Sequence, residues 1–182
     1  GSGSFIYALG PVGHRVLHRE QPRPRYREPT AMFVDHTLAI TQLVIDLIAA
    51  ARTGGLELLV CQPEPRCWRP FTSTNGLTTL RPDLFVSLGV GEFEHRWFCE
   101  IDRGTEHLPA LIRKCRVYEN YYATGTEQAD HGVSPRVCWL VPDTHRADRL
   151  RKAIDDDRRL TDALFVVATT DHALQTLRGG ER

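Results

Sequence analysis

The order in which helical and strand-like apolar patterns follow one another is the feature that most constrains this 182-residue chain. Short β-prone apolar runs alternate with stretches whose apolar residues recur every three or four positions, the spacing of an amphipathic helix. The resulting order is helix, three strands, helix, strand, helix, strand, helix. The three successive strands have short connections and should form an antiparallel meander, whereas later strands arrive through helices and should pair in parallel. The sequence therefore predicts an α/β fold, a mixed central sheet with an αβββαβ core and helices on both faces.

Each predicted element is bounded by turn or capping residues. Asp35 is a plausible N-cap for a helix from about 36 to 52, and Asp171 can cap a last short helix. The region from Pro63 to Gly76 is turn-rich and is expected to lack regular structure. The other predicted elements are helices at about 108–123 and 146–155 and strands at 56–61, 84–88, 96–102, 136–141 and 164–168.

A stretch rich in proline and arginine divides the chain. Residues 21–33 contain Pro22, Pro24 and Pro29 among arginines, and proline cannot donate to a helix or a central strand. This stretch is expected to be an extended basic linker between residues 1–20 and a domain at 34–182. The first four residues, Gly-Ser-Gly-Ser, resemble an expression scar, so the natural N-terminus is expected to lie upstream.

Composition excludes little by itself. Lys plus Arg and Asp plus Glu each number 23, so net charge gives no argument for nucleic acid or membrane, although a neutral total can hide a basic face. Five cysteines without CxxC spacing favour a reducing cytosol over a disulfide framework, so a cytoplasmic location is expected. No apolar stretch approaching the roughly 18 residues of a membrane-spanning helix is expected, so no membrane partner is expected. The sequence contains no glycine-rich phosphate loop, so no small-molecule cofactor is expected.

Acidic residues at the ends of two middle strands are the most informative local feature. Asp83 starts the second predicted strand, and Glu100 and Asp102 end the third on one face, since side chains two apart share a face. In an antiparallel hairpin these positions meet, and converging carboxylates suit Mg²⁺ or Mn²⁺. Glu57, on the first strand, could add a fourth acidic group. The alternative is a solvated face or pairing with nearby arginines.

Lys114 is one of only two lysines in the chain and belongs to the helix predicted after the third strand. At about 100° per residue it lies at the border of the apolar stripe, near Tyr118 and Tyr121. From there the amine can reach over the sheet edge toward the carboxylates, where it could orient a water or neutralise a phosphoryl transition state. The equally weighted alternative is a lysine whose aliphatic stem covers apolar surface.

Taken together, these motifs resemble the replication-relaxation family of bacterial plasmid and mobile-element proteins. The resemblance is carried by Arg81-Pro82-Asp83, by Phe98-Cys99-Glu100-Ile101-Asp102-Arg103-Gly104-Thr105-Glu106, by Lys114 and by Tyr118 to Tyr122. It extends from about Asp35 to the last strand. Members commonly carry a preceding winged helix, and the resemblance implies that residues 1–20 are the wing and closing helix of such a domain, with the recognition helix upstream.

The acidic positions also resemble the PD-(D/E)XK nuclease superfamily, which places an acid after proline and then acid-x-lysine on the next strand. Asp83 and Glu100 match the two acids, but Asp102 occupies the lysine position. Some members move that lysine to the following helix, where Lys114 lies. The resemblance implies a nuclease-like fold more firmly than nuclease activity.

Two functions follow from these resemblances. The first is a Mg²⁺-dependent DNA endonuclease or nickase, with Asp83, Glu100 and Asp102 as metal ligands, Lys114 and Glu57 assisting, and phosphate contacts from Arg103, Arg113 and Arg116. The second is a non-catalytic DNA-binding regulator of plasmid replication or transfer, whose nuclease-like domain mediates homodimerisation or partner docking. Metal binding that depends on Asp83 and Glu100 would distinguish them.

Overall fold

The computed structural model describes residues 10, 12–13, 16, 30–73 and 76–179. The chain divides into two compact units, residues 1–34 and 35–182. Most of the winged-helix region predicted within residues 1–20, and most of the linker predicted at 21–33, lie outside the described residues. The second unit contains the sheet and the candidate site.

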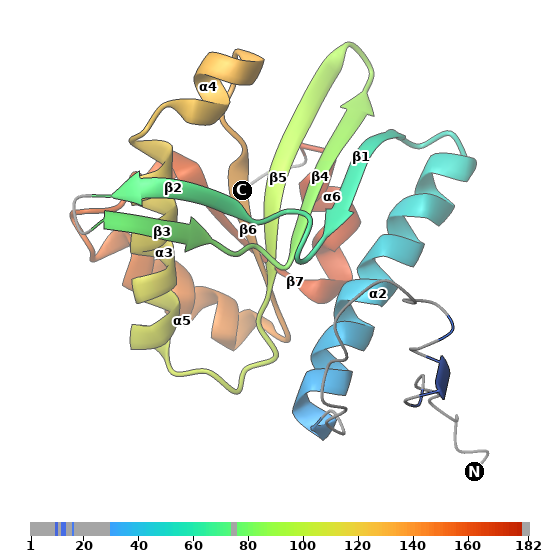
Figure 1. Cartoon of the computed structure of the whole chain (residues 1–182), viewed down its shortest axis with the longest axis horizontal. Helices are drawn as coiled ribbons and strands as arrows, with labels where there is room; N and C mark the ends of the chain where they lie inside the picture. The colour runs from blue at the N-terminus through green and yellow to red at the C-terminus, as the bar shows by residue number, and fades with distance from the viewer. Residues whose placement is uncertain (1–9, 11, 14–15, 17–29, 74–75, 180–182) are drawn as a thin grey trace. The chain divides into compact units, whose positions relative to one another are not determined.

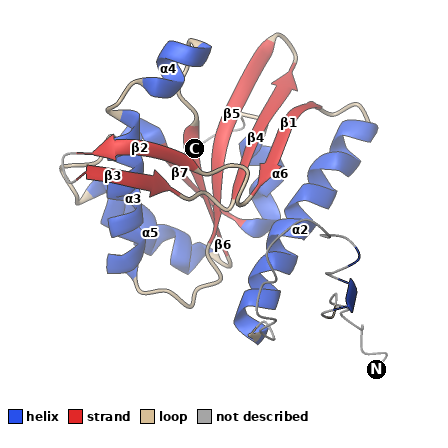
Figure 2. Ribbon diagram, viewed as in Figure 1, coloured by secondary structure: helices blue, strands red, loops and turns tan. Residues whose placement is uncertain are grey.

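A five-stranded mixed sheet forms the centre of the second unit (Figures 1 and 2). Its spatial order is β1-β4-β5-β6-β7, in which β4 is antiparallel to both β1 and β5, while β5, β6 and β7 run parallel to one another. This arrangement confirms the predicted α/β class and the mixed sheet. The strands are β1 (Glu57–Pro63), β4 (Leu84–Val90), β5 (Phe93–Ile101), β6 (Arg136–Val141) and β7 (Phe165–Thr169).

Helices cover both faces of this sheet. On one face, α2 (Ala31–Arg52) and α6 (Ala173–Leu177) share an apolar cluster with Leu84, Trp97 and other residues of the strands. On the other, α3 (Leu108–Tyr122) and α5 (Thr144–Asp155) pack with Phe85, Phe98 and their neighbours. Because β4, β6 and β7 are buried on both sides, their sequences are nearly continuous apolar runs rather than alternating ones.

The region expected to be irregular contains a hairpin. Strands β2 (Arg69–Ser73) and β3 (Gly76–Leu80) pair with each other in a separate two-stranded sheet, and they lie against α3 (Figure 1). The expectation for Pro63 to Gly76 was therefore wrong over β2. Proline and threonine weakened the strand signal there, and pairing within the hairpin together with packing on α3 overrode it.

Helix α2 begins earlier than predicted. Its start is capped by Thr30, whose side chain accepts a hydrogen bond from the backbone of Phe33 at 3.2 Å, so Asp35 lies inside the helix and is not its N-cap. By length and composition alone, α2 is also apolar enough to cross a membrane, so the expectation that the chain has no such stretch was wrong. Four of its residues are buried against the sheet, and core helices pass the same test.

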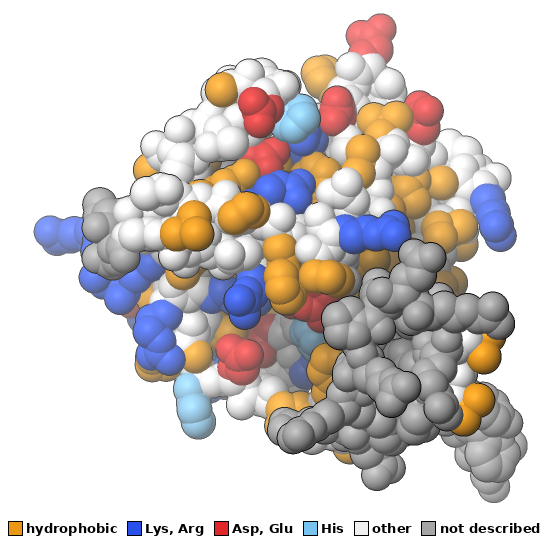
Figure 3. All heavy atoms as spheres, in the orientation of Figure 1, with side chains coloured by type: hydrophobic (Ala, Val, Ile, Leu, Met, Phe, Trp, Pro, Cys, Tyr) orange, Lys and Arg blue, Asp and Glu red, His pale blue; other side chains and the backbone are white. Residues whose placement is uncertain are grey.

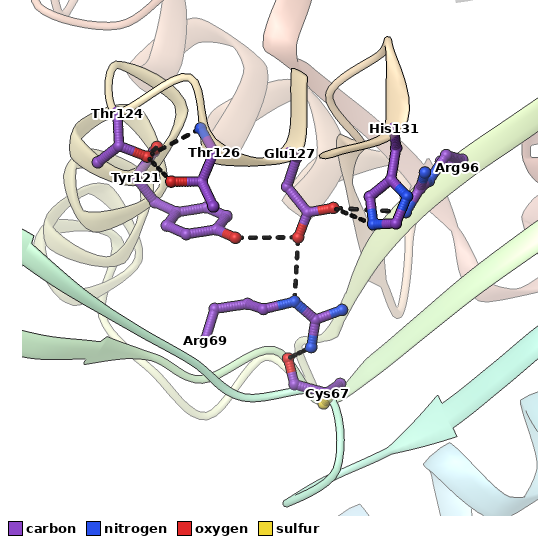
Figure 4. A network of polar contacts seen from close by, with 8 residues as sticks. All are labelled: Cys67, Arg69, Arg96, Tyr121, Thr124, Thr126, Glu127 and His131. Carbon is purple, nitrogen blue, oxygen red and sulfur yellow. Dashed lines mark hydrogen bonds and ion pairs between the residues drawn. The ribbon is translucent and has the colours of Figure 1, made fainter. Parts of the chain in front are cut away.

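A buried glutamate connects the hairpin, the main sheet and a short helix that the sequence did not predict, α4 (Thr126–His131) (Figure 4). Glu127 accepts a hydrogen bond from Arg69 Nε at 3.0 Å and one from Tyr121 at 2.9 Å. Its other oxygen lies 3.4 Å from Arg96 Nη2 and 3.9 Å from His131 Nε2. We refer to these five residues as the Glu127 network.

Candidate active site

Asp83 lies directly before β4 and is almost fully buried. Its Oδ2 accepts a hydrogen bond from the backbone amide of Ile101 at 2.8 Å, which fixes the carboxylate against the end of β5. The register pairs Leu84 with Cys99, so Asp83 meets the neighbourhood of Glu100 as expected for an antiparallel pair.

Glu100 projects from β5 toward α3 and its side chain is only 1% exposed. One of its oxygens accepts a hydrogen bond from Lys114 Nζ, and the other accepts one from the hydroxyl of Tyr118. Both donors come from α3, one helical turn apart, so the two side chains project from the same face of that helix. Every oxygen of this buried carboxylate therefore has a partner.

Lys114 joins the two carboxylates. Its Nζ donates to Glu100 and lies 3.9 Å from Oδ1 of Asp83. The lysine side chain is 34% exposed, far more than that of Glu100, and its amine lies against the two buried acids. The sequence expectation that this lysine reaches the carboxylates agrees with this placement.

The two carboxylates differ in the protonation state that their surroundings favour. Burial raises the pKa of Glu100 to about 8, and the negative charge of Asp83 raises it further, while Lys114 and Tyr118 oppose the rise. For Asp83 burial again acts upward, but His36, Lys114 and the amide of Ile101 outweigh it and lower the pKa below its ordinary value. Two neighbouring acids with separated pKa values are the pattern of an acid and base pair.

The pKa of Lys114 is raised. Burial alone would lower it, but the negative charges of Glu100 and Asp83 are stronger. The amine is therefore held as an ammonium group next to the two acids, where a cation is electrostatically favoured.

His36, on α2, is a further member of the site, whereas the sequence predicted only that a helix begins there. Its Nε2 lies 3.3 Å from Oδ1 of Asp83, and this contact raises the pKa of His36 above its ordinary value. Apolar periodicity shows which side of α2 faces the sheet but not which strand end the helix crosses. We call His36, Asp83, Glu100, Lys114 and Tyr118 the carboxylate–lysine cluster.

Asp102 does not join this cluster. It projects to the same side of the sheet as Glu100, as expected, but its Oδ2 binds Arg146 Nε of α5 at 2.6 Å. Its other oxygen accepts the amide of Gly104 at 2.9 Å. The expectation that Asp102 converges with Asp83 and Glu100 is therefore not met, because a guanidinium from a later helix neutralises it.

Glu57 is also placed elsewhere. In the antiparallel pairing of β1 with β4, Glu57 lies opposite Gly89, whereas Pro63 lies opposite Leu84. Glu57 is thus at the end of β4 away from Asp83, roughly 20 Å along the strand at about 3.3 Å per residue. We do not assign it to the site.

The three arginines expected to bind phosphate have different surroundings. Arg103 donates to the backbone of Asp35 at 2.8 Å, and Arg116 donates to Asp157 at 2.8 Å. Arg113 is exposed, and within residues 30–73 and 76–179 its guanidinium has no carboxylate partner. Of the three, Arg113 has the charge most available to a ligand.

The cluster meets the requirements of a hard divalent ion only in part. Within the described ranges, no group of three or more His, Cys, Asp and Glu side chains is positioned to hold a metal. Two carboxylates do face one point, which is the number that Mg²⁺ commonly takes along with water and phosphate. In this structure the Lys114 ammonium lies between them.

These features define a class: an α/β protein with a mixed sheet and a buried carboxylate–lysine cluster where β4 starts and β5 ends. The sequence model described as replication-relaxation matches residues 1–137, which include β4, β5 and α3 and every member of the cluster. The chain therefore belongs to the replication-relaxation family, which suggests a role in plasmid or mobile-element replication. Neither the curated proteins nor the solved structures contain a match.

Proposed function

We propose that the chain is a DNA-processing protein of plasmid or mobile-element replication whose carboxylate–lysine cluster hydrolyses phosphodiester bonds. The observation that supports this most directly is the meeting of Asp83, Glu100 and Lys114 at one point. Their places before β4, on β5 and on the following helix match the acidic and lysine positions of a PD-(D/E)XK-like nuclease with a displaced lysine.

Each member has a role that suits its surroundings. The side chain of Lys114 is partly exposed, and its ammonium would stabilise charge on the phosphoryl oxygens of a bound phosphate. Asp83, ionised at neutral pH, would accept the proton of an attacking water as the new P–O bond forms and the ester P–O bond breaks. The departing oxygen would take its proton from solvent.

Asp83 and Glu100 are the residues that would hold Mg²⁺ or Mn²⁺. When bound, the ion would supply further neutralisation of the phosphate. Tyr118 would keep Glu100 oriented, because its hydroxyl binds the oxygen turned away from Lys114.

The test is cleavage of supercoiled, linear and branched DNA by the 182-residue chain with Mg²⁺ or Mn²⁺ and with chelator. We expect nicking or cutting by the unaltered chain, loss of it in Lys114→Met, and unchanged cleavage in Arg149→Ala. Arg149 is a suitable control because it is an exposed arginine on α5 that, within the described residues, forms no hydrogen bond or ion pair with the cluster. No cleavage under any of these conditions would contradict the proposal.

One observation favours a second candidate, a non-catalytic DNA-binding regulator in which this domain mediates dimerisation or partner docking. Both oxygens of Glu100 already have donors, and Asp102 is neutralised by Arg146, so the acids are internally compensated. Calorimetric titration with Mg²⁺ separates the two. Binding that is lost in Asp83→Ala and Glu100→Ala supports the nuclease, and no binding supports the regulator.

A further inference from the structure

We propose that Trp68 and Arg81 form a stacking platform for single-stranded nucleic acid beside the carboxylate–lysine cluster, with Arg66 and Arg113 binding the strand's phosphates. This inference rests on the proposed function in naming DNA as the ligand. It assigns the substrate of the site as a single strand and not a duplex.

Two hydrogen bonds hold the platform next to the cluster. The loop after β1 is bonded to the two residues that precede β4: the Glu64 amide donates to the Asp83 carbonyl at 3.1 Å, and Cys67 Sγ donates to the Pro82 carbonyl at 2.9 Å. Trp68 follows directly after Cys67, and Arg81 comes directly before Pro82. Arg81 is therefore only two residues from Asp83, so a ligand on the platform would lie beside the cluster.

The guanidinium of Arg81 lies over the ring of Trp68, 4.8 Å from its centroid. Arg81 is exposed, and over the described ranges its guanidinium forms no ion pair or hydrogen bond. Arg69 and Arg96, which also lie over aromatic rings, are instead bound to Glu127. Arg81 thus has an outer face and a charge that the fold does not use.

A planar guanidinium supported by an aromatic ring suits an unpaired base. Bases in single strands stack on aromatic side chains and on arginine planes, and this stacking tolerates any sequence. Bases inside a duplex cannot reach such a platform without leaving the stack. The pair therefore favours a single strand over double-stranded DNA.

Two further arginines could supply phosphate contacts. Arg66 lies in the loop before Trp68 and Arg113 directly before Lys114; both are exposed, and in the described part of the chain neither guanidinium has a carboxylate partner. On the face drawn in Figure 3, several Lys and Arg side chains lie at the left edge and below the hairpin, among uncharged and hydrophobic side chains, and most acidic side chains lie nearer the top. An anionic strand would meet some of these basic side chains there.

The test measures binding of a fluorescent oligothymidine of 15 nucleotides, and of a duplex of equal length, by anisotropy in chelator so that no cleavage occurs. We expect the single strand to bind more tightly, Arg81→Ala to weaken that binding about tenfold, and Arg149→Ala to leave it unchanged. Binding should also quench Trp68 fluorescence, because Trp97 and Trp139 are each only 2% exposed. Arg66→Ala should reduce the salt dependence by about 0.7 in logarithmic slope.

Tighter binding to duplex, equal effects of Arg81→Ala and Arg149→Ala, or absence of single-strand binding would each overturn the inference. Because binding is measured without metal and repeated in Lys114→Met, its outcome is independent of cleavage. A chain that binds the single strand through Arg81 but cuts nothing would retain the platform and lose the nuclease. Far-ultraviolet circular dichroism of Arg81→Ala verifies that the variant is folded.

Discussion

Two buried glutamates on the same side of the sheet, Glu100 and Glu127, have similar partners and different consequences. Each accepts a hydrogen bond from a tyrosine of α3, Tyr118 for Glu100 and Tyr121 for Glu127. Glu127 is paired with two arginines, which stay charged at any accessible pH, whereas Glu100 is paired with a lysine. The Glu127 pairs involve permanently charged arginines and join structural elements, whereas the Glu100–Lys114 pair contains protons that can be transferred.

Removing the charge of Glu127 is expected to have the largest effect on stability. In Glu127→Gln the buried guanidinium of Arg96 loses the nearer of its two carboxylate partners, and breaking a buried pair costs about 3–5 kcal/mol. Urea unfolding should show this loss. Glu100→Gln is the matched control and should lose no more than about 1.5 kcal/mol, because its partner Lys114 is partly exposed and can be hydrated. Equal losses in the two variants would remove the contrast.

Lys114→Met should lower cleavage by about 100-fold or more while the fold persists, since a positioned charge at a phosphoryl centre is worth that much. It should also raise the pKa of Glu100 further, because Lys114 opposes the effect of burial. Cleavage rates and a carboxyl titration by NMR measure both. A variant that cuts normally would show that the lysine only shields the acids.

The pH dependence of stability should differ between the unaltered chain and Glu100→Gln. A carboxyl whose folded pKa of about 8 exceeds its ordinary value contributes stability that is complete below about 4.5 and is lost as the pH rises toward 8. The unaltered chain should therefore lose stability relative to the variant between pH 5 and 8. Unfolding free energies at four pH values check this, and a constant difference would contradict the raised pKa.

His36→Gln should have the smallest effect, about 0.5 kcal/mol, because the pair with Asp83 is partly exposed. The raised pKa of His36 gives stability that is present below pH 6.5 and is lost as the pH rises through the folded value. The difference from the unaltered chain should therefore vanish in mildly basic solution. A loss that persists at pH 9 would indicate a packing role.

The sequence predicted the part of the site that depends on local geometry. A short connection between two strands places Asp83 beside Glu100, and helical periodicity turns Lys114 toward them. The partner of Asp102 is 44 residues away in sequence, beyond the reach of such patterns. Glu57 was predicted to join the site only because it is acidic, although antiparallel pairing already places the start of β1 beside the end of β4.

Contacts between elements distant in sequence determine the parts of the fold and of the site that the sequence did not predict. His36 is part of the site because α2 crosses the start of β4, and apolar periodicity cannot predict that crossing. The β2–β3 hairpin was missed because its residues have weak strand preference, so its partner strand and α3 stabilise it.

That hairpin leaves the main sheet at Pro63 and returns at Leu84, two residues that face each other across β1 and β4. Its departure and return are thus adjacent points, joined by the Glu64–Asp83 backbone bond. The segment could be lengthened at its tip by an engineer without moving these attachment points, provided that its core residues Phe71 and Leu80 and the Glu127 partner Arg69 are kept. Under the proposed function, grafting foreign hairpin tips there would be a way to change which nucleic acids reach the site while keeping its chemistry.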